Sequence, residues 1–401
     1  MEYSLPQENS TEAELARYNA QIHFIFLLYT RSQNQRQRVY GCFELAIMEL
    51  IRGIHNIRAH HYGCVLTIGN FDGVHLGHKA LLRQLKHEGQ RLKAPVMVMI
   101  FEPQPLELFA PEKAPTRLTR LRDKIKYLAQ IGVDYLLCVR FTLPFATLTA
   151  HEFITQLLVK KLKIKFLTVG DDFHFGSDRL GDIKLLQQAG TEFGFDVVNT
   201  GSFCNSGSRI SSTAIRQALQ NDDLVLAEDL LGHPYSITGR VIHGDELGRT
   251  LGFPTANISL KRLAAPVKGV YAVDVYGLSS IPTVLQVAAS RPGRETDERR
   301  QLRDSANVRS QQRGSFEGEG YTGSDDKPLR GVANIGTRPT VAGSRQQLEV
   351  HIFAITKDLY GCHIEIVLRE KLRNERCFVS LDTLRQQIAS DVLMAKKFFR
   401  L

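Results

Sequence analysis

Two histidines, His75 and His78, follow a glycine-rich stretch whose residue types could bind phosphate groups. An apolar run over 65–68 predicts a buried strand before the stretch, and an apolar stripe over 75–87 predicts a helix after it. A helix N-terminus offers free N–H groups and a positive dipole end to a phosphate. The spacing puts both imidazoles on one helix face, where they can hydrogen-bond phosphates and the charge that develops on them. The neighbouring residues that we expect to contact a nucleotide are Gly69, Asn70, Phe71, Asp72 and Gly73.

Two other interpretations of this stretch are a surface turn and a histidine pair that binds a metal. Gly69 and Gly73 allow the backbone to approach a ligand closely. Together with the strand before the stretch and the helix after it, they favour phosphate binding over both alternatives.

A second group of candidate residues lies between Gly239 and Asn257, in a chain that contains no P-loop signature. Gly244 and Gly248 could form a loop over phosphates, with Arg249 beside it. Thr255 and Asn257 are two residues apart, so in an extended segment both side chains point to one side. Their neutral oxygens could share one Mg²⁺ with the oxygens of ATP. A hairpin rich in turn residues explains the same pattern equally well.

The elements that must position these residues fall into two patterns. From about residue 48, strands at 65–68, 96–100, 135–139 and 166–169 alternate with helices, which predicts a parallel sheet of the α/β class. After helices at 213–219 and 224–231, strands follow one another without helices, which indicates an antiparallel β-barrel or sandwich, followed by an amphipathic helix from about 381. These later strands are expected at 236–242, 270–276, 331–335, 348–355 and 364–368.

Composition narrows the class of protein. The chain has 401 residues, room for two domains, and a formal net charge of +9. That charge suits an anionic ligand, and without a stripe of basic and aromatic residues it does not favour nucleic acid. Six cysteines without a C-x-x-C pair argue against disulfides or zinc and fit the cytoplasm. The apolar run 22–29 is far shorter than the ~20 residues of a membrane span, so we expect neither a targeting segment nor membrane insertion.

Two segments are poor in apolar residues and are expected to be disordered. The first is 1–47, which shows no sustained periodicity. The second is about 286–330, which is rich in Arg, Ser, Gly and acidic residues. A G-x-G-x-x-G match at 318–323 lies inside the second segment with no strand before it, so we do not assign it a dinucleotide site.

The first stretch resembles the H-x-G-H signature of the nucleotidyltransferase superfamily, in the form seen in bacterial bifunctional riboflavin kinase/FAD synthetases. Segments 101–105, 169–176 and 210–216 resemble three further motifs of that family, in order. The resemblance implies that the FMN phosphate attacks the α-phosphorus of ATP and that pyrophosphate leaves. It assigns stabilisation of the α-phosphate to His75 and His78. It also assigns the outgoing phosphates to Ser212, Thr213 and Arg216, and flavin contacts to Asp172 and Phe173.

Two residues of this half depart from the family pattern. Gln104 stands where the family usually has His, and His174 stands where Arg is common. Glutamine can hydrogen-bond but cannot carry charge, so a lower rate or affinity in adenylylation is expected.

The later part of the chain resembles the riboflavin kinase module of the same family through G-F-P-T-A-N at 252–257, 334–339 and L-E-V-H at 348–351. The resemblance implies that Glu349 is the general base that accepts the proton of the ribityl hydroxyl. It implies that Mg²⁺ binds at Thr255 and Asn257 and that Arg373 lies beside the isoalloxazine ring. ATP would be the co-substrate of both reactions, with riboflavin and FMN as the flavin substrates.

The expected organisation is a non-family extension at 1–47, an FMN adenylyltransferase domain at 48–232 and a riboflavin kinase domain at 233–401. The alternative is an adenylyltransferase whose kinase half is impaired by the insertion at 286–330. A basic nucleic-acid-binding protein on the same fold is the third possibility. The oligomeric state stays open.

Overall fold

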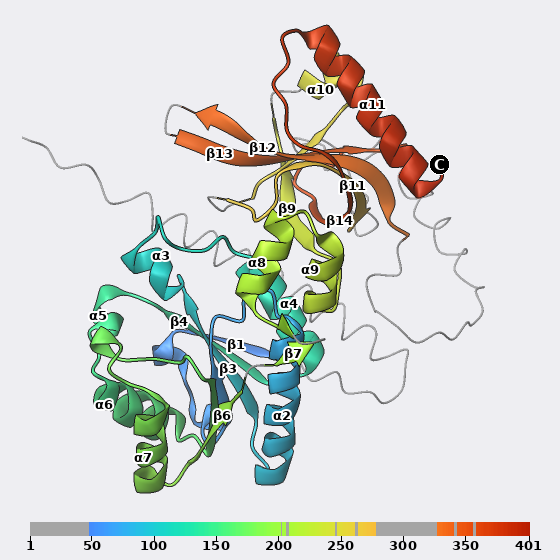
Figure 1. Cartoon of the computed structure of the whole chain (residues 1–401). Coiled ribbons are helices and arrows are strands. Elements are labelled where there is room, and N and C mark those ends of the chain that lie inside the picture. The colour runs from blue at the N-terminus through green and yellow to red at the C-terminus, as the bar shows by residue number, and fades with distance from the viewer. Residues whose placement is uncertain are drawn as a thin grey trace, which may run out of the picture. The chain divides into compact units, whose positions relative to one another are not determined.

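The computed structural model describes residues 48–201, 203–205, 208–244, 247–260, 264–277, 327–340, 343–355 and 358–401 (Figure 1). The chain divides into two compact units. The first consists of residues up to Phe71, His78–Ala114 and Lys124–Ser202. The second consists of Asp72–Gly77, Pro115–Asp123 and Phe203–Leu401. The extension expected at 1–47 lies outside the described residues.

A six-stranded parallel sheet forms the first unit, in the order β1-β4-β3-β2-β5-β6. The predicted α/β class is therefore confirmed. The edge strands β1 and β6 were not expected from the sequence, because they carry few fully buried residues and show little apolar pattern. The strands are β1 (Glu49–Arg52), β2 (Val65–Ile68), β3 (Val96–Glu102), β4 (Tyr135–Arg140), β5 (Phe166–Gly170) and β6 (Asp196–Thr200).

Helices cover both faces of this sheet. Leu157 and Leu158 of a π-helical segment, together with Leu186 of α7, pack against one face. Figure 1 shows α2 on the opposite side of the sheet from α7, and its Leu82 and Leu85 are buried. The main helices are α2 (Leu76–Leu92), α4 (Leu121–Ile131), η3 (Phe153–Leu162, the π-helical segment) and α7 (Ile183–Phe193), with short turns α3 (Pro105–Phe109), α5 (Leu143–Ala146) and α6 (Ala150–Glu152). Further one-turn helices are η1 (Ile54–Asn56), η2 (Ala59–His61) and η4 (Ser177–Arg179).

The strand order reverses between β2 and β5. After β2 the chain moves outward through β3 and β4, and it then returns to β5 on the other side of β2. In open α/β sheets, ligands bind at the carboxyl ends of the strands beside such a reversal. The glycine-rich stretch follows the carboxyl end of β2, and the segment 169–176 lies at that of β5. Both motifs therefore meet the sheet where this fold binds ligands.

The second unit contains a closed antiparallel barrel in the order β10-β13-β12-β11-β14-β9, and pairing of β9 with β10 closes it. The predicted barrel and the predicted C-terminal helix are confirmed. Tyr271, Ala333, Leu348, Val350 and Ile366 are completely buried. The strands are β9 (Ser236–Ile242), β10 (Ala256–Ile258), β11 (Gly269–Tyr276), β12 (Leu329–Thr340), β13 (Gly343–Ile352) and β14 (His363–Arg373).

The two strands that flank the segment expected to be disordered both belong to the closed barrel. β11 and β12 flank that segment and pair with each other, with Val275 opposite Leu329. The expected end of the segment at 330 is wrong, because Leu329 and Arg330 already belong to β12. Arg330 forms an ion pair with the buried Asp274, which holds it in the strand. The rest of the segment, up to residue 326, lies outside the described residues.

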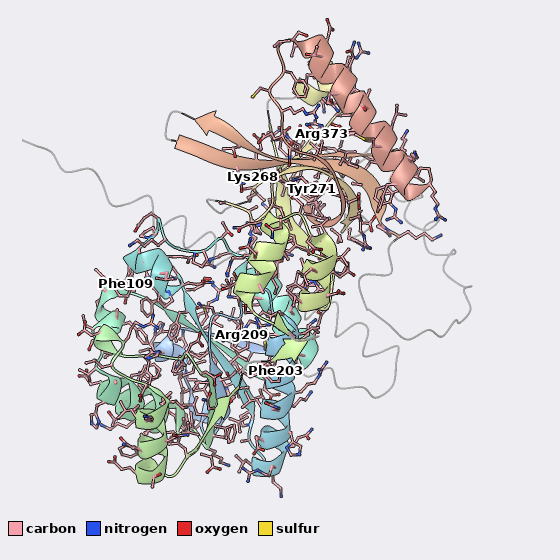
Figure 2. All side chains as sticks on the ribbon, in the orientation of Figure 1. Phe109, Phe203, Arg209, Lys268, Tyr271 and Arg373 are labelled. Carbon is pink, nitrogen blue, oxygen red and sulfur yellow. The ribbon has the colours of Figure 1, made fainter. Side chains whose placement is uncertain are left out.

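Helices α8 (Ser212–Gln220), α9 (Leu224–Leu231), α10 (Leu247–Thr250) and α11 (Leu381–Phe399) complete the second unit, with short strands β7 (Cys204–Asn205) and β8 (Ser208–Arg209). The Ser211 hydroxyl caps α8 by accepting the Ala214 N–H. Figure 2 labels Tyr271 and Lys268 at the barrel, and the Tyr271 hydroxyl donates to the Lys268 carbonyl. No helix among the described residues is long and apolar enough to span a membrane.

The segment Pro115–Asp123, which we call the strap, belongs to the second unit and contacts strand β9. Arg120 Nη1 donates to the Thr238 carbonyl at 2.6 Å, and the Thr238 hydroxyl donates to Asp123 Oδ1 at 2.7 Å. Burial raises the pKa of Asp123, although the Thr238 hydroxyl and Arg120 counteract the shift. The ionised carboxylate is therefore less favourable in the folded chain than in the unfolded one.

Asp123→Asn tests this burial. A raised folded pKa gives stability that is fully present below the unfolded pKa of about 4 and is lost as pH rises through the folded pKa. The introduced amide mimics the protonated acid and does not ionise. The Tm of the variant, relative to that of the native chain, should therefore rise by a few degrees as pH increases from about 4.5 to 8 (roughly 2–4 °C per kcal/mol). Thermal unfolding across that range measures the difference. An identical difference at every pH, or the same trend in Asp229→Asn on the exposed side of α9, would contradict the argument.

Candidate active sites

The glycine-rich stretch leaves β2 and enters α2 in a conformation that L-residues rarely adopt. Phe71, Gly73 and Val74 have φ angles of 48°, 86° and 43°. In the first unit the ring of Phe71, 2% exposed, lies 4.7 Å from that of His78, between centroids. Asn70 is exposed just before it. The loop is thus held by a buried aromatic contact while its tip reaches solvent.

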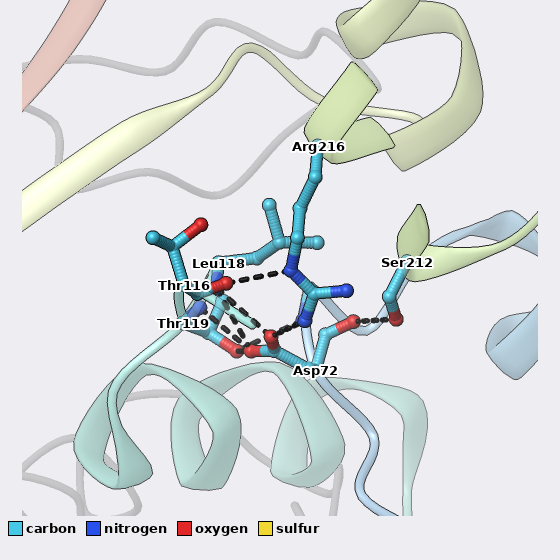
Figure 3. Close-up of polar contacts among 7 residues, drawn as sticks. Asp72, Thr116, Leu118, Thr119, Ser212 and Arg216 are labelled. Carbon is cyan, nitrogen blue, oxygen red and sulfur yellow. Dashed lines mark hydrogen bonds and ion pairs between the residues drawn. The ribbon is translucent and has the colours of Figure 1, made fainter. Parts of the chain in front are cut away.

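In the second unit the Asp72 carboxylate organises the rest of this loop (Figure 3). Asp72 is 2% exposed and accepts hydrogen bonds from the backbone N–H groups of Leu118 and Thr119 and from the Thr119 hydroxyl. The Ser212 hydroxyl donates to its carbonyl oxygen at 2.8 Å. A carboxylate can be buried only when such donors replace water. The loop, the strap and the start of α8 are thereby joined at one residue.

Arg216 also binds this carboxylate. Its Nη2 donates to Asp72 Oδ2 at 2.6 Å, and its Nε donates to the Thr116 carbonyl at 2.6 Å. The guanidinium has further N–H groups that these two bonds leave available. Arg216 is thus placed beside the predicted phosphate loop, with its direction fixed by the loop itself. Thr213, in the first turn of α8, is exposed.

His75 lies in the second unit immediately before α2 and is 6% exposed. His78 belongs to the first turn of α2 and is half-buried. The structure therefore places both at the helix N-terminus that the sequence predicted.

Gln104 follows β3 and precedes the short helix α3. It is 5% exposed, and its backbone N–H donates to Glu107 Oε2 at 2.9 Å. Among the described residues, its side-chain Nε2 has no hydrogen-bond partner. A buried amide donor without a partner costs free energy, and such a group suits a site that is completed by a ligand.

An aromatic row in the first unit was not identified from the sequence. It runs from Phe109 through Phe141, Phe145 and Phe153 to Phe175 and Phe173, with successive ring centroids 5.2–6.5 Å apart. One end, Phe109 on α3, is 58% exposed (Figure 2), and the other end lies in the predicted flavin-side segment, where Asp172 is exposed. The signal available in the sequence was the presence of phenylalanines close to two motifs, with Phe109 after 101–105 and Phe173 within 169–176. Their spacing along the chain follows no helix or strand period.

The predicted kinase residues meet on the outer wall of the barrel. Strand register places Glu349 of β13 opposite Asn257 of β10 on one side and opposite Asn334 of β12 on the other. Leu348 and Val350, which flank Glu349, are buried inside the barrel, so the Glu349 side chain faces outward. One carboxylate and two amides thus form a row across three neighbouring strands.

The phosphate-loop residues of this half lie beside the row. A Cβ added to Gly244 would clash with the Asn257 side-chain nitrogen, so glycine at 244 allows this close approach of the Asn257 amide. The Gly248 carbonyl accepts a hydrogen bond from the Phe253 N–H at 2.8 Å, and Gly248 lies against Thr255. Arg249, in α10, is exposed. These contacts bring the predicted loop to the strand that carries Asn257.

Arg373, predicted to contact flavin, forms a bidentate ion pair with Asp391 of α11, with both N–O distances 2.8 Å. Asp391 is 2% exposed. The pair joins the end of β14 to α11, and the guanidinium lies 5.8 Å from the Phe378 ring centroid. Arg373 therefore holds the helix at this edge of the barrel.

The two units of the fold match the two enzyme domains of a class of proteins that form flavin nucleotides. Residues 57–214 match the family model for FAD synthetase, and residues 231–399 match that for riboflavin kinase. The bifunctional riboflavin kinase/FMN adenylyltransferase of Escherichia coli K12 is 58% identical over 355 residues, which cover 88% of this chain and 99% of that protein. The chain therefore belongs to the bifunctional riboflavin kinase/FMN adenylyltransferase family.

A second relative and one solved structure are also similar to this chain. The Haemophilus influenzae enzyme of the same name is 47% identical over 352 residues, which cover 88% of this chain and 99% of that protein. A solved structure from Streptococcus pneumoniae, titled as a macrolide-efflux protein, superposes with a TM-score of 0.62 at 27% identity. It covers 86% of this chain and 97% of that one. The architecture of this chain thus extends to a distant homologue.

Asp72→Asn should disrupt the loop. The amide would direct N–H groups at the Leu118 and Thr119 donors and leave Arg216 without its counter-charge. Removing one partner of a buried pair typically costs about 3–5 kcal/mol of stability. We expect the lower end here, seen as a fall in the denaturant midpoint. Asp229→Asn, an exposed carboxylate of α9, is the control and should change it little. Equal midpoints for the two variants would refute the role given to Asp72.

Proposed function

We propose that this chain phosphorylates riboflavin to FMN with ATP and then adenylylates FMN to FAD with release of pyrophosphate. The observation that carries the proposal is the position of the two loops: the His75–His78 stretch and the 169–176 segment follow neighbouring strands at the reversal of the sheet. We assign adenylylation to residues 48–232 and phosphorylation to residues 233–401.

In the adenylylation half, the FMN phosphate oxygen attacks the α-phosphorus of ATP, and the bond to the bridging oxygen of pyrophosphate breaks. His75 and His78 donate to the phosphate oxygens that gain charge in the transition state. The N–H groups at the start of α2 contribute the same kind of stabilisation. Ser212, Thr213 and the remaining N–H groups of Arg216 bind the leaving pyrophosphate.

In the kinase half, Glu349 accepts the proton of the ribityl 5′-hydroxyl as that oxygen attacks the γ-phosphorus of ATP, and ADP leaves. The residues suit Mg²⁺, which prefers few protein oxygens: the Asn257 amide oxygen accepts one hydrogen bond from Gln347 and has a second lone pair. Thr255 and Asn257 would hold the ion. When bound, it would neutralise charge on the ATP phosphates. Gly244, Gly248 and Arg249 would cover those phosphates.

The structure of the barrel supports an intact kinase half over the alternative of an impaired one. Its strands close through the β9–β10 pair, and the strands before and after the inserted segment keep their antiparallel register. An insertion at the tip of a hairpin costs little, because loop entropy grows slowly with length.

We assign the flavin ring of the adenylylation site to the aromatic row. An exposed phenylalanine offers an apolar face on which a planar ring system can stack. Phe109 provides that face, and the row ends at Phe173 beside Asp172. Gln104 Nε2, which has no hydrogen-bond partner among the described residues, offers a donor immediately before α3, the helix that carries Phe109.

The thiols fit a reducing compartment, and we place the protein in the cytoplasm. Among the described residues, Cys64, Cys138, Cys362 and Cys377 form no disulfide, and burial raises the pKa of the Cys64 thiol to about 12. A buried, protonated thiol is chemically inert.

The two activities should separate by mutation. Glu349→Gln should lower FMN formation from riboflavin by roughly 100- to 10,000-fold, because the general base is lost. It should leave FAD formation from supplied FMN unchanged. His78→Gln should do the reverse and lower FAD formation by roughly 100-fold. Chromatographic separation of the flavins after incubation with ATP and Mg²⁺ measures both reactions. Each variant controls for the fold of the other, and loss of both activities in either variant, each measured from its own flavin substrate, would contradict the assignment.

Phe109→Ala tests the flavin surface. Loss of a stacking ring typically costs about 1–3 kcal/mol, so the KM for FMN in adenylylation should rise about tenfold. Riboflavin phosphorylation should not change. Phe193→Ala, which removes a phenylalanine that is 37% exposed on α7, is the matched control. If both variants keep the native KM for FMN, the row does not bind the flavin.

A further inference from the structure

The strap carries none of the motifs that the sequence identified, yet it contacts the phosphate loop directly. Its Leu118 and Thr119 contribute two backbone N–H groups and one hydroxyl to the Asp72 carboxylate. Its Thr116 carbonyl accepts from Arg216 Nε. Figure 3 shows the bonds from Leu118 and Thr119 meeting Asp72, with Arg216 above it and Ser212 on the side opposite to Leu118 and Thr119.

The Thr119 hydroxyl bonds in two directions. It accepts the Gly73 N–H at 2.9 Å and donates to Asp72 Oδ1 at 3.1 Å, and the residue is 7% exposed. The Gly73 N–H is thereby occupied and does not face a phosphate. The hydroxyl instead fixes the turn that presents the following residues, among them His75.

Packing reinforces the same turn. Gly73 has a φ of 86°, and a Cβ there would lie 3.0 Å from Leu118 Cδ1. The loop backbone therefore lies directly on the strap. A shift of the strap would move the loop, because the Leu118 side chain lies directly against the Gly73 backbone.

The strap is held at its other end by the barrel. Arg120 donates to the Thr238 carbonyl, and the Thr238 hydroxyl donates to Asp123. Thr238 lies in β9, and both bonds are within the second unit. Thr119 thus sits on a segment that is anchored without any ligand.

The geometry points to Thr119 as a positioning residue for adenylylation, which acts by fixing the Gly73 turn before His75 and by holding the Asp72 carboxylate that directs Arg216. The inference rests on the proposed function of the His75–His78 stretch and adds to it a residue outside its motifs. Thr119 does not itself contact the reacting atoms.

The test is Thr119→Val in the full chain. Valine has the same shape but leaves a buried N–H and a carboxylate without their partner, which should displace the loop and lower the rate of adenylylation by roughly 10- to 100-fold. We expect kcat for FAD formation to fall by that factor, while KM for FMN and the rate of riboflavin phosphorylation change less than about threefold. Thr119→Ser keeps the hydroxyl and should restore most of kcat.

Thr67→Val is the matched control. Thr67 in β2 is 1% exposed, and its hydroxyl forms no hydrogen bond among the described residues, so the variant should keep the native kcat. A merely structural role for Thr119 predicts that both activities fall together and that serine and valine lower Tm alike. That result, or a native kcat in Thr119→Val, would overturn the inference. Absence of FAD formation in the native chain would instead overturn the proposed function.

Discussion

The buried carboxylate of Asp72 is the interaction on which the geometry of the phosphate loop depends. It is 2% exposed and accepts bonds from Leu118, Thr119 and Arg216. A carboxylate removed from water is stable only while such donors stay in place. The positions of the loop, the strap and α8 therefore depend on one another. A change in any of them leaves the buried Asp72 carboxylate with too few hydrogen-bond partners.

Strand register plays the corresponding part in the barrel. Glu349 lies opposite Asn257 and Asn334 only because β13 pairs with both neighbours in one register. A slip by one residue would turn Glu349 into the core and expose Leu348 or Val350, which the apolar interior opposes. The hydrophobic pattern that closes the barrel thus also fixes which side chains meet outside it. The inserted segment leaves this register intact because it joins strands that remain paired.

The sequence predicted the elements with strong periodicity and the residues within motifs. The alternation of strands and helices indicated the parallel sheet, and the H-x-x-H stretch was placed at the strand-to-helix turn where the structure has it. The weakly patterned elements were not predicted: β6 is mostly exposed and β10 has three residues. The strap and the aromatic row were missed for a different reason. Thr119 meets Asp72 across 47 positions of sequence, and such a contact leaves no local pattern.

The two arginines illustrate what a motif can and cannot specify. Arg216 and Arg373 were assigned to ligands from their motifs, and each forms an ion pair with a buried aspartate, Asp72 or Asp391. The motif position requires a planar, permanently charged group with several donors, but it does not identify the anion. One guanidinium can bind a carboxylate with some N–H groups and offer the others to a phosphate. Loss of activity on replacing Arg216 would therefore follow from collapse of the loop as readily as from a lost phosphate contact. Only substitutions that keep the charge and disturb the loop, such as those at Thr119, can separate the two effects.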